Sequence, residues 1–355
     1  MMKVLIAMSG GVDSSVAAKL LCDEGYECIG CTMKLYDNCD AGLPRGRTCC
    51  SLDDVEDARS VAFSLGMRYY VFNFKDDFRE KVIKKFASGY LRGQTPNPCI
   101  DCNRYMKFDK LLERAKLLGC DKLATGHYAR IEFDGEKYRL KKALDKSKDQ
   151  SYVLYMLTQE QLAHTLFPLG SLHKTDTRAI ADAADLSSAR KPDSQDICFV
   201  PDGDYAAAIE RLTGEKAPCG DFIDASGKIL GTHRGITHYT VGQHRGLGLS
   251  LPERRYVCGI DAESGTVTLG GSDELYSSTA EVRDFNWISG EAPSEPIRCT
   301  AKIRYRQPEQ PATAIAHKDG SITIQFDAPQ RAVTPGQAAV LYDGDTVLGG
   351  GEIVR

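Results

Sequence analysis

The beginning of the chain constrains its fold most strongly. An apolar run at residues 4–8 predicts a short buried strand, and residues 9–15 (Ser-Gly-Gly-Val-Asp-Ser-Ser) predict a glycine turn that opens a helix. The apolar face of that helix would consist of Val16, Ala17, Leu20 and Leu21. Because glycines let the backbone approach a ligand and a helix start offers unpaired N–H groups, this turn suits a phosphate. It is not a Walker loop, since no Gly-Lys-Ser/Thr closes it.

Strand and helix signals alternate after this turn. The expected strands are residues 28–33, 69–74 and 122–125, and the expected helices are 51–65, 76–92 and 105–118. Ser51 gives the first of these helices a capping-box-like start, and Gly66 ends it. We also expect an amphipathic helix from about Tyr152, with helical segments continuing to about Leu186. This α/β alternation implies a parallel sheet with helices on its faces, and ligands at the carboxyl ends of its strands.

The second half of the chain has a different character. At 355 residues the chain suggests two or three domains. We expect an α/β domain at residues 1–204, a small linker domain at 205–272 and an antiparallel β-barrel at 273–355, because glycine, proline and short period-two strands replace the helical pattern. The expected barrel strands are 301–306, 312–316, 322–326 and 338–342.

The composition narrows the class of protein. Apolar residues make up 42% and charged residues 26% of the chain, and no apolar run approaches the length of a membrane span, so we expect a soluble cytoplasmic protein with no membrane partner. Thirteen cysteines, an odd number, fit thiols, a metal site or a redox site in a reducing compartment. The net charge of −4 argues against a general basic coat for nucleic acid, although a local basic face remains compatible with it.

Two cysteine loops are candidates for chemistry. Cys99 and Cys102 form a Cys-x-x-Cys pair after two prolines, and Cys198 lies in a separate loop. Cys102 comes near an expected helix start and two residues before Arg104, where the dipole and the cation would lower a thiol pKa. Half of a zinc site and ordinary thiols are the alternatives, and the cysteines by themselves do not decide among them.

Several motifs together resemble one enzyme family. Residues 9–15 resemble the pyrophosphate loop of ATP pyrophosphatases, which cleave ATP between the α- and β-phosphates and adenylate a substrate. With the other motifs, the chain is similar to bacterial tRNA-specific 2-thiouridylases. Those motifs are Thr-Pro-Asn-Pro-x-x-x-Cys-Asn at 95–103, Ala-Thr-Gly-His-Tyr-Ala at 124–129, Lys-Asp-Gln-Ser-Tyr at 148–152, Asp-Ser-Gln-Asp-Ile-Cys-Phe at 193–199 and Thr-Val-Gly-Gln-x-x-Gly-Leu-Gly at 240–248, with Arg304-Tyr305 and Pro335-Gly336-Gln337 extending the match.

The resemblance implies a fold and a reaction. The fold would be an ATP-pyrophosphatase (adenine nucleotide alpha hydrolase-like) domain, a linker domain and a β-barrel. The family replaces the C2 oxygen of the wobble uridine (U34) of tRNA with sulfur, through an adenylated uridine, so the implied cofactors are ATP and Mg²⁺. The implied partners are the anticodon loops of tRNAs for Lys, Glu and Gln, and a persulfide donor such as a cysteine desulfurase or a relay protein.

The resemblance also implies roles for single residues. Cys198 would carry the persulfide, and Cys102 would release its sulfur and leave a disulfide between the two. The residues implied at ATP are Ala7, Met8, Ser9, Gly10, Gly11, Val12, Asp13, Ser14, Met33 and Gly126. Those implied at the target base are Asn97, Pro98 and Cys99, and those implied at tRNA are His127, Lys148, Asp149, Gln150, Arg304, Tyr305 and Gln337. For His127 the alternative is a buried structural histidine.

Some alternatives stay open at this point. Some relatives carry Asp at the position of Cys99, and Cys99, Cys102 and Cys198 could instead hold a [4Fe–4S] cluster whose open iron binds sulfide. The roles of Cys39, Cys49 and Cys50 are undefined. The rival functions are another pyrophosphate-loop synthetase that adenylates a small molecule, and a noncatalytic RNA-binding or metal-storage protein, for which an ATP loop has no use.

Overall fold

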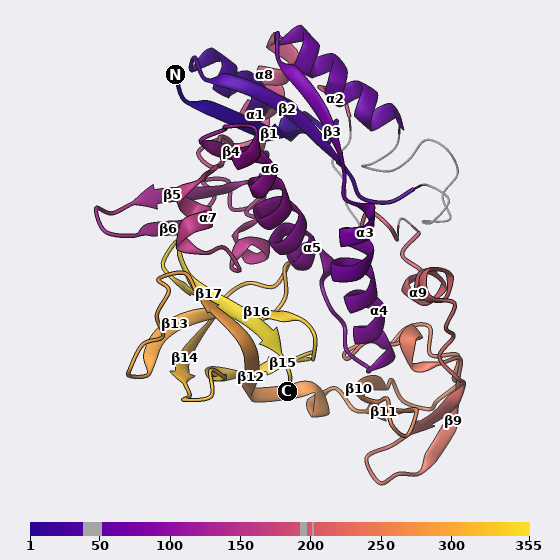
Figure 1. Ribbon diagram of the computed structural model, residues 1–355. Helices are drawn as coiled ribbons and strands as arrows, with labels where there is room; N and C mark the ends of the chain where they lie inside the picture. The colour runs from indigo at the N-terminus through magenta and orange to yellow at the C-terminus, as the bar shows by residue number, and fades with distance from the viewer. Residues whose placement is uncertain (38–51, 192–196, 201) are drawn as a thin grey trace.

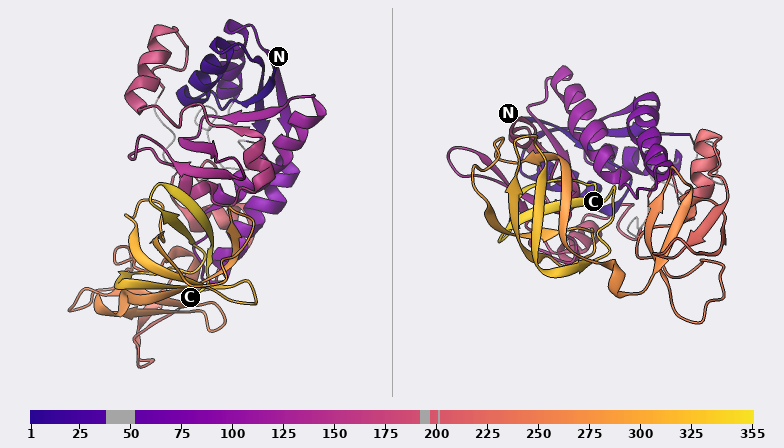
Figure 2. Two further views of the ribbon diagram at one scale, coloured as in Figure 1. Left: turned by 90° about the vertical axis from the view of Figure 1, so that its left-hand side faces the viewer. Right: turned by 90° about the horizontal axis from the view of Figure 1, so that it is seen from below.

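The described residues form three β-sheets, and each occupies mainly its own part of the chain (Figure 1). The computed structural model describes residues 1–37, 52–191, 197–200 and 202–355. Cys39, Cys49, Cys50 and the expected helix cap Ser51 lie outside the described residues. The barrel and the small middle sheet lie side by side at the end of the molecule away from α1 (Val12–Asp23) and α2 (Leu52–Ser64) (Figures 1 and 2).

The N-terminal sheet is parallel and five-stranded, as the α/β alternation predicts. Its order is β3-β2-β1-β4-β7, formed by β1 (Lys3–Ala7), β2 (Glu27–Lys34), β3 (Arg68–Asn73), β4 (Lys122–Thr125) and β7 (Thr165–Leu166). Side chains alternate across it: Val4 and Ile6 pack with α1, α2 and α8 (Lys174–Ala183), whereas Leu5 packs in a separate core with helices on the opposite face. Both faces are therefore covered, which explains why β1 is a continuous apolar run.

Two broken helices cover the second face. The first consists of α3 (Lys75–Phe78), the π-helix η1 (Arg79–Ile83) and α4 (Lys84–Leu91), and the second of α5 (Pro98–Asp101), the π-helix η2 (Cys102–Leu111) and α6 (Leu112–Leu117). The second helix begins earlier than expected, because Pro98 stands at its first position, where no N–H is needed, and the Asn97 side chain accepts from the N–H of Cys99. Cys99 and Cys102 therefore lie in a helix, and the prediction of a non-helical Cys-x-x-Cys segment was wrong.

The prediction of an amphipathic helix from Tyr152 was wrong, whereas the helical segments expected as far as Leu186 are present. The structure has a 3₁₀ turn, η3 (Ser151–Leu154), and two separate helices, α7 (Gln159–Ala163) and α8. Residues 151–157 are all buried, which no one-faced surface helix could achieve. Thr158 then starts α7 through a capping box with Gln161. A hairpin that the sequence analysis did not anticipate, β5 (Ala129–Phe133) with β6 (Tyr138–Lys142), precedes this region.

The middle of the chain forms a small sheet beside the end of α4. Its strands have the order β10-β11-β8-β9, and its elements are α9 (Tyr205–Thr213), β8 (Gly220–Ile223), β9 (Ile229–His233), η4 (Ile236–His238), β10 (Tyr256–Asp261) and β11 (Thr266–Gly270). Phe222, Val257 and Val267 form its core with no exposed surface. Leu91 at the end of α4 packs against this core, so the small sheet is attached to the helix that leads toward the thiols.

The last sheet closes into an antiparallel barrel, as expected. The strands β12 (Tyr276–Trp287), β15 (Ile322–Arg331), β14 (Gln310–Ala316), β13 (Ile297–Lys302), β16 (Ala338–Asp343) and β17 (Thr346–Ile353) follow in this order after η5 (Asp273–Leu275), and β12 pairs with β17. The expected strand 301–306 ends at Lys302, and β12 and β17 were not anticipated. The hairpin strand β6 pairs with β17 and extends the barrel sheet. Among the described residues, no helix is long and apolar enough to cross a membrane.

We predict that Phe86→Ala destabilises the protein strongly. Phe86 is fully buried on α4 and contacts Tyr90, Phe199 and Tyr205 with ring centroids 5.0–6.2 Å apart. Emptying such a site costs about 3–5 kcal/mol. Thermal unfolding followed by circular dichroism should show a clear drop in Tm. The control is Phe63→Ala on α2, where the ring is 64% exposed and the Tm should hardly change. Equal shifts in the two variants would contradict this description of the core.

Candidate functional site

Two glycines let three segments meet at the carboxyl edge of the parallel sheet. Gly10 has a φ of +76°, and a Cβ there would lie 2.4 Å from the carbonyl oxygen of Asp54 in α2. Gly126, just after β4, would carry a Cβ 2.8 Å from the backbone nitrogen of Ser14. No side chain fits at either position, so the turn after β1, the start of α2 and the end of β4 are in backbone contact.

The turn itself is organised by serine hydroxyls. The N–H of Ser9 donates to Oγ of Ser14 at 3.1 Å, and that hydroxyl donates to the carbonyl of Gly11 at 3.1 Å. Gly11 is the N-cap of α1 and has no side chain that could accept from the first N–H groups of the helix. The positive end of the helix therefore faces the turn without a side-chain cap, which is the arrangement that binds phosphates.

The other residues implied at ATP lie around this turn. Ala7 at the end of β1 pairs with Cys31 of β2 and with Thr125 of β4, which puts the three strand ends side by side. Met8 is buried and its carbonyl accepts from the Thr32 hydroxyl at 2.6 Å. Val12 begins α1, and Met33 lies near the end of β2. All ten residues thus lie on the turn or on the neighbouring strands β1, β2 and β4 and the residue after β4, and their contacts with a nucleotide remain a prediction.

Asp13 is the charged centre of the turn. Nζ of Lys174, the first residue of α8, lies 2.7 and 2.8 Å from its two carboxylate oxygens. The Tyr128 hydroxyl lies 2.9 Å from Asp13 Oδ1 and 2.9 Å from the Thr177 hydroxyl. The sequence analysis missed Lys174, Tyr128 and Thr177 as partners of the turn, and no local signal could have found Lys174, because it is 161 residues from Asp13.

The thiols lie on other segments of the same domain, and Cys102, Cys198, Ala7 and Met33 pack against one apolar core. Cys99 is exposed on α5, and Cys102, half-buried, begins η2. Cys198 is half-buried, and its carbonyl accepts from the Tyr36 hydroxyl at 2.9 Å. Cys102 and Cys198 pack against the same apolar cluster. The expected exchange between Cys102 and Cys198 therefore involves two segments of one core.

The described residues do not offer a preformed metal site. Within residues 1–37, 52–191, 197–200 and 202–355, no three His, Cys, Asp or Glu side chains are grouped so that they could hold a metal ion. Cys99, Cys102 and Cys198 are all among these residues and form no such group, so a [4Fe–4S] cluster on these three thiolates remains a prediction. We therefore derive no step through a cluster.

We call α5 and η2, which carry Cys99 and Cys102, the thiol helix. The segment before it contacts loops of the middle region and of the barrel region. The N–H of Thr95 donates to the carbonyl of Pro335 at 2.8 Å, and Nε2 of Gln337 donates to the carbonyl of Thr95 at 2.6 Å. The Thr95 hydroxyl also lies 3.4 Å from the Thr240 hydroxyl of the middle region. A Cβ on Gly336 would lie 2.8 Å from the Thr95 nitrogen. We call these contacts of Thr95 with Thr240, Pro335, Gly336 and Gln337 the Thr95 junction.

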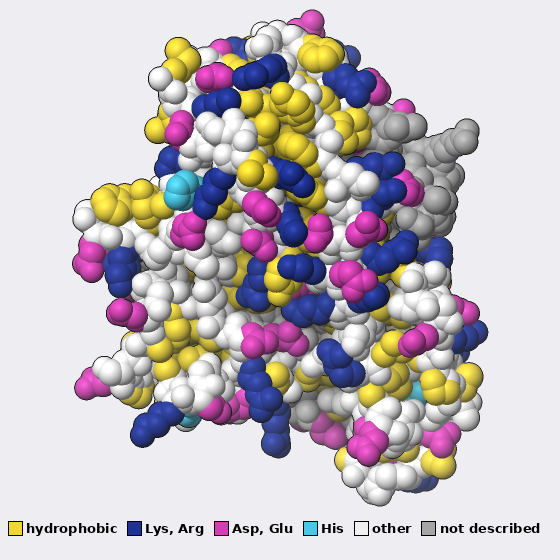
Figure 3. Space-filling model, in the orientation of Figure 1, with side chains coloured by type: hydrophobic (Ala, Val, Ile, Leu, Met, Phe, Trp, Pro, Cys, Tyr) yellow, Lys and Arg dark blue, Asp and Glu magenta, His cyan; other side chains and the backbone are white. Residues whose placement is uncertain are grey.

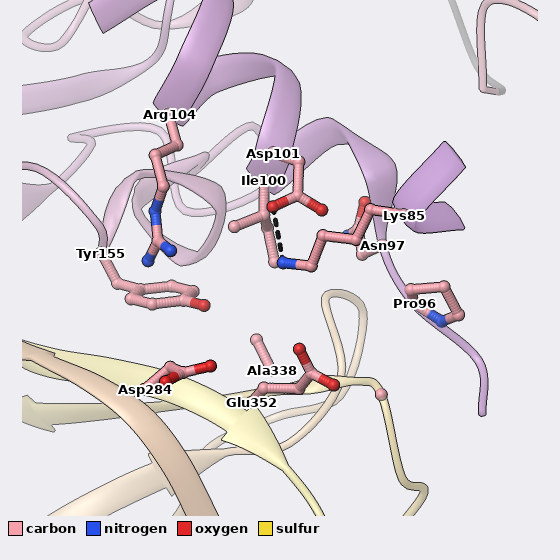
Figure 4. Close-up of a pocket in the computed structure, with 11 residues that line it drawn as sticks. Lys85, Pro96, Asn97, Ile100, Asp101, Arg104, Tyr155, Asp284, Ala338 and Glu352 are labelled. Atoms are coloured by element: carbon pink, nitrogen blue, oxygen red, sulfur yellow. Dashed lines mark hydrogen bonds and ion pairs between the residues drawn. The ribbon is translucent and has the colours of Figure 1, made fainter. Parts of the chain in front are cut away.

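A pocket lies beside this junction, between α5 and the barrel (Figure 4). Nζ of Lys85 forms an ion pair with the buried Asp101 at 2.9 Å, and Glu352, Asp284 and Arg104 point toward the same space. Burial raises the pKa of Asp101 although Lys85 opposes this, and burial likewise raises the pKa of Glu352. The pocket encloses about 30 Å³, which suits a water molecule rather than a base.

Arg304 joins the barrel to the middle region. Its Nη2 donates to the carbonyls of Val241 and Ala332, both at 3.1 Å, and to the Thr334 hydroxyl at 2.8 Å. Tyr305 next to it is 37% exposed, and its hydroxyl lies 3.4 Å from the carbonyl of Asp149. The guanidinium of Arg304 is therefore engaged within the protein, whereas the ring of Tyr305 reaches the surface.

Asp149 and Gln150, also expected at tRNA, form hydrogen bonds within the protein through their side chains. The Asp149 carboxylate accepts from the N–H of Ala143 at 2.9 Å and from the Ser151 hydroxyl at 2.8 Å. Gln150 Oε1 accepts from the N–H of Tyr128 at 3.0 Å, and Lys148 is half-buried. Contacts of these three residues with tRNA remain a prediction.

His127, two residues after the end of β4, is buried and only 8% exposed. Its Nδ1 is 2.7 Å from the Thr125 hydroxyl and its Nε2 is 3.3 Å from Nζ of Lys107. Burial, together with the charge of Lys107, holds the pKa of His127 well below its ordinary value, so the ring is neutral at pH 7. Its contact with tRNA also remains a prediction.

The visible surface has a mixed charge. On the face in Figure 3, Lys and Arg side chains are interspersed with Asp and Glu rather than gathered into one patch. This face therefore forms no general basic coat, in line with the net charge of −4.

Comparison with known proteins gives a consistent assignment along the whole chain. Family models match residues 2–202 as a tRNA methyl transferase HUP domain, residues 208–271 as a tRNA methyl transferase PRC-barrel domain and residues 277–353 as an aminomethyltransferase beta-barrel domain. Among solved structures, an NMN synthetase from Francisella tularensis matches with a TM-score of 0.35 and 17% identity, over 61% of this chain and 78% of that one.

Curated relatives match over nearly the full length. The tRNA-specific 2-thiouridylase MnmA of Acetivibrio thermocellus is 52% identical, covering 99% of both chains. The tRNA-specific 2-thiouridylase MnmA of Clostridioides difficile is 48% identical, covering 99% of this chain and 98% of that one. With the phosphate-type turn, the thiol helix and the barrel in one chain, these matches show that the protein belongs to the tRNA-specific 2-thiouridylase family.

Proposed function

We propose that this protein catalyses the ATP-dependent 2-thiolation of the wobble uridine of tRNA. The observation that carries the proposal is the identity of about half of the residues, over 99% of the chain, with relatives named for this activity. The glycine turn supports it as a nucleotide site, and the Thr95 junction supports it by linking the thiol helix to the barrel.

The first step would activate the uridine. A C2 carbonyl is a poor electrophile, and its oxygen is a poor leaving group. In the proposed step that oxygen attacks the α-phosphorus of ATP, the bond to the β-phosphate breaks, and pyrophosphate leaves with Mg²⁺ on its oxygens. The N–H groups at the start of α1, beside Asp13 and Ser14, are suited to the leaving pyrophosphate. The product is an O2-adenylated uridine, from which AMP can depart.

The second step would transfer sulfur. A donor protein first delivers a persulfide to Cys198, and its terminal sulfur attacks C2 as AMP leaves. The Cys102 thiolate then attacks Sγ of Cys198, the S–S bond to the transferred sulfur breaks, and the electron pair stays on that sulfur as the thiocarbonyl. The result is 2-thiouridine and a Cys102–Cys198 disulfide, which a cellular dithiol must reduce before the next cycle. The packing of both residues on one core supports this exchange.

The partners follow from this chemistry. A wobble base lies in a single-stranded loop, so it can be turned out of the stack at modest cost. Asn97, Pro98 and Cys99 at the start of α5 would contact it, and the tRNAs for Lys, Glu and Gln are the proposed substrates. Tyr305, whose ring is partly exposed, would contact the tRNA. A synthetase that adenylates a small molecule is the rival, and it would release pyrophosphate without tRNA.

We predict that Asp13→Ala lowers tRNA-dependent pyrophosphate release at least 100-fold. The change removes the carboxylate that holds Lys174 and Tyr128 at the turn. tRNA affinity, measured by filter binding, should stay within a factor of about two, since tRNA contacts other parts of the chain. Asp23→Ala, at the exposed end of the same helix, is the control and should behave like the wild type. Normal release by Asp13→Ala would show that the turn is not the ATP site.

We predict that Cys102→Ser and Cys198→Ser each abolish thiolation but keep most of the pyrophosphate release. Adenylation needs the turn and a positioned base, whereas sulfur transfer needs both thiols afterwards. Mass spectrometry of digested tRNA would measure thiolation, and Cys219→Ser, at an exposed thiol, is the control.

Cys99→Ser should slow thiolation only modestly, because in a persulfide relay Cys99 is only a neighbour of the base. Stoichiometric iron in anaerobically purified protein, lost together with activity in Cys99→Ser, would refute the persulfide relay.

We predict that Arg304→Ala weakens tRNA binding because it disturbs the contact between the barrel and the middle region. We do not expect it to remove a contact with a phosphate of the tRNA. Its guanidinium bonds to Val241, Ala332 and Thr334, so its loss loosens the middle region from the barrel. The Tm should fall, and the slope of log Kd against log salt should not change. A slope smaller by about one unit would instead identify Arg304 as a phosphate ligand.

A further inference from the structure

We propose that Lys174 binds the phosphates of ATP and that Asp13 holds its ammonium group at the turn between reaction cycles. This inference rests on the proposed function, because it assigns one more residue to the nucleotide site. It concerns a residue outside every motif by which the chain resembles its family.

The turn lacks a positive charge of its own. Residues 9–15 contain one acidic side chain, Asp13, and no basic one. The triphosphate of ATP is strongly anionic, and it would meet a carboxylate at the centre of its site. The helix dipole of α1 offers only about half a charge. A cation from another part of the chain would offset this charge together with Mg²⁺, and the ammonium of Lys174 lies within 2.8 Å of Asp13.

The position of Lys174 suits this role. It is the first residue of α8, and its side chain is 13% exposed, compared with 32% for Asp13. The ammonium also lies 5.7 Å from the centre of the Tyr128 ring, which stabilises a cation. Lysine is a compact point charge on a flexible stem, and such a group can move between a carboxylate and a phosphate over a short distance.

A purely structural role explains the ion pair less well. The helices α1 and α8 share an apolar core in which Ala17 and Ala181 have no exposed surface. The attachment of α8 therefore does not require the ion pair. Asp13 also has a second partner, since the Tyr128 hydroxyl lies 2.9 Å from its Oδ1. The carboxylate would thus keep a hydrogen bond when the ammonium turns to a phosphate.

The test measures binding of α,β-methylene-ATP, which this reaction cannot cleave, by calorimetry in the presence of Mg²⁺. We expect Lys174→Met to raise the Kd about 10- to 100-fold, as for loss of a charged hydrogen bond. Lys174→Arg should recover part of the affinity. Lys19→Met is the control: it removes a lysine of α1 that pairs with Asp23 instead of Asp13, and it should leave the Kd unchanged. Wild-type affinity in Lys174→Met would overturn the proposal.

A double variant separates phosphate binding from simple neutralisation of Asp13. If Lys174 contacts phosphate, Asp13→Asn combined with Lys174→Met should bind the analogue as weakly as Lys174→Met alone. Recovery of wild-type affinity in the double variant would show that Lys174 only neutralises Asp13, and it would refute the proposal. A wild-type protein that binds the analogue but releases no pyrophosphate with tRNA would contradict the proposed function and leave the assignment of Lys174 intact.

Discussion

The hydrogen bonds at Thr95 hold the start of the helix that carries Cys99 and Cys102 against the barrel. Thr95 bonds to Pro335 and Gln337 of the barrel, and two residues later Asn97 caps the helix that carries Cys99 and Cys102. The Lys85–Asp101 ion pair braces the same helix from α4. A shift of the barrel would therefore move the start of α5 directly, because few rotatable bonds separate them. The barrel therefore helps to position the helix that carries Cys99 and Cys102.

The glycine turn imposes a second constraint, which acts through backbone contact. Gly10 and Gly126 allow α1, α2 and β4 to approach so closely that a methyl group fits at neither position. The same closeness turns the uncapped start of α1 toward one point, where Asp13, Tyr128 and Lys174 meet. The proposed phosphate site therefore depends on a close backbone approach that only glycine allows at these two positions.

Apolar spacing and glycine positions predicted helices and strands within single segments. They failed where contacts between residues far apart in the chain determine the structure. The strand, turn and helix at residues 3–23 could be predicted, since apolar spacing and glycines specify them within one segment. The helix expected from Tyr152 was wrong, because burial from the barrel side overrides its periodicity: the Tyr152 hydroxyl donates to the carbonyl of Ala338 at 2.7 Å. The same limit applies to the site. Motifs indicated the turn and the cysteines, but the approach of Lys174 to Asp13 and the bonds of Arg304 exist only after folding.

The hairpin β5–β6 has a consequence for how the chain is assembled. Arg130 on β5 bonds to Asp345 at 2.6 Å across a separation of 215 residues, and β6 pairs with β17. During synthesis the hairpin emerges long before β17, its partner strand. The edge of β6 therefore stays unpaired until β17 has left the ribosome. A fragment cut before the barrel would expose that edge permanently, and exposed edges recruit other strands. Quality control of this protein should therefore be most sensitive to truncation at its C-terminal end.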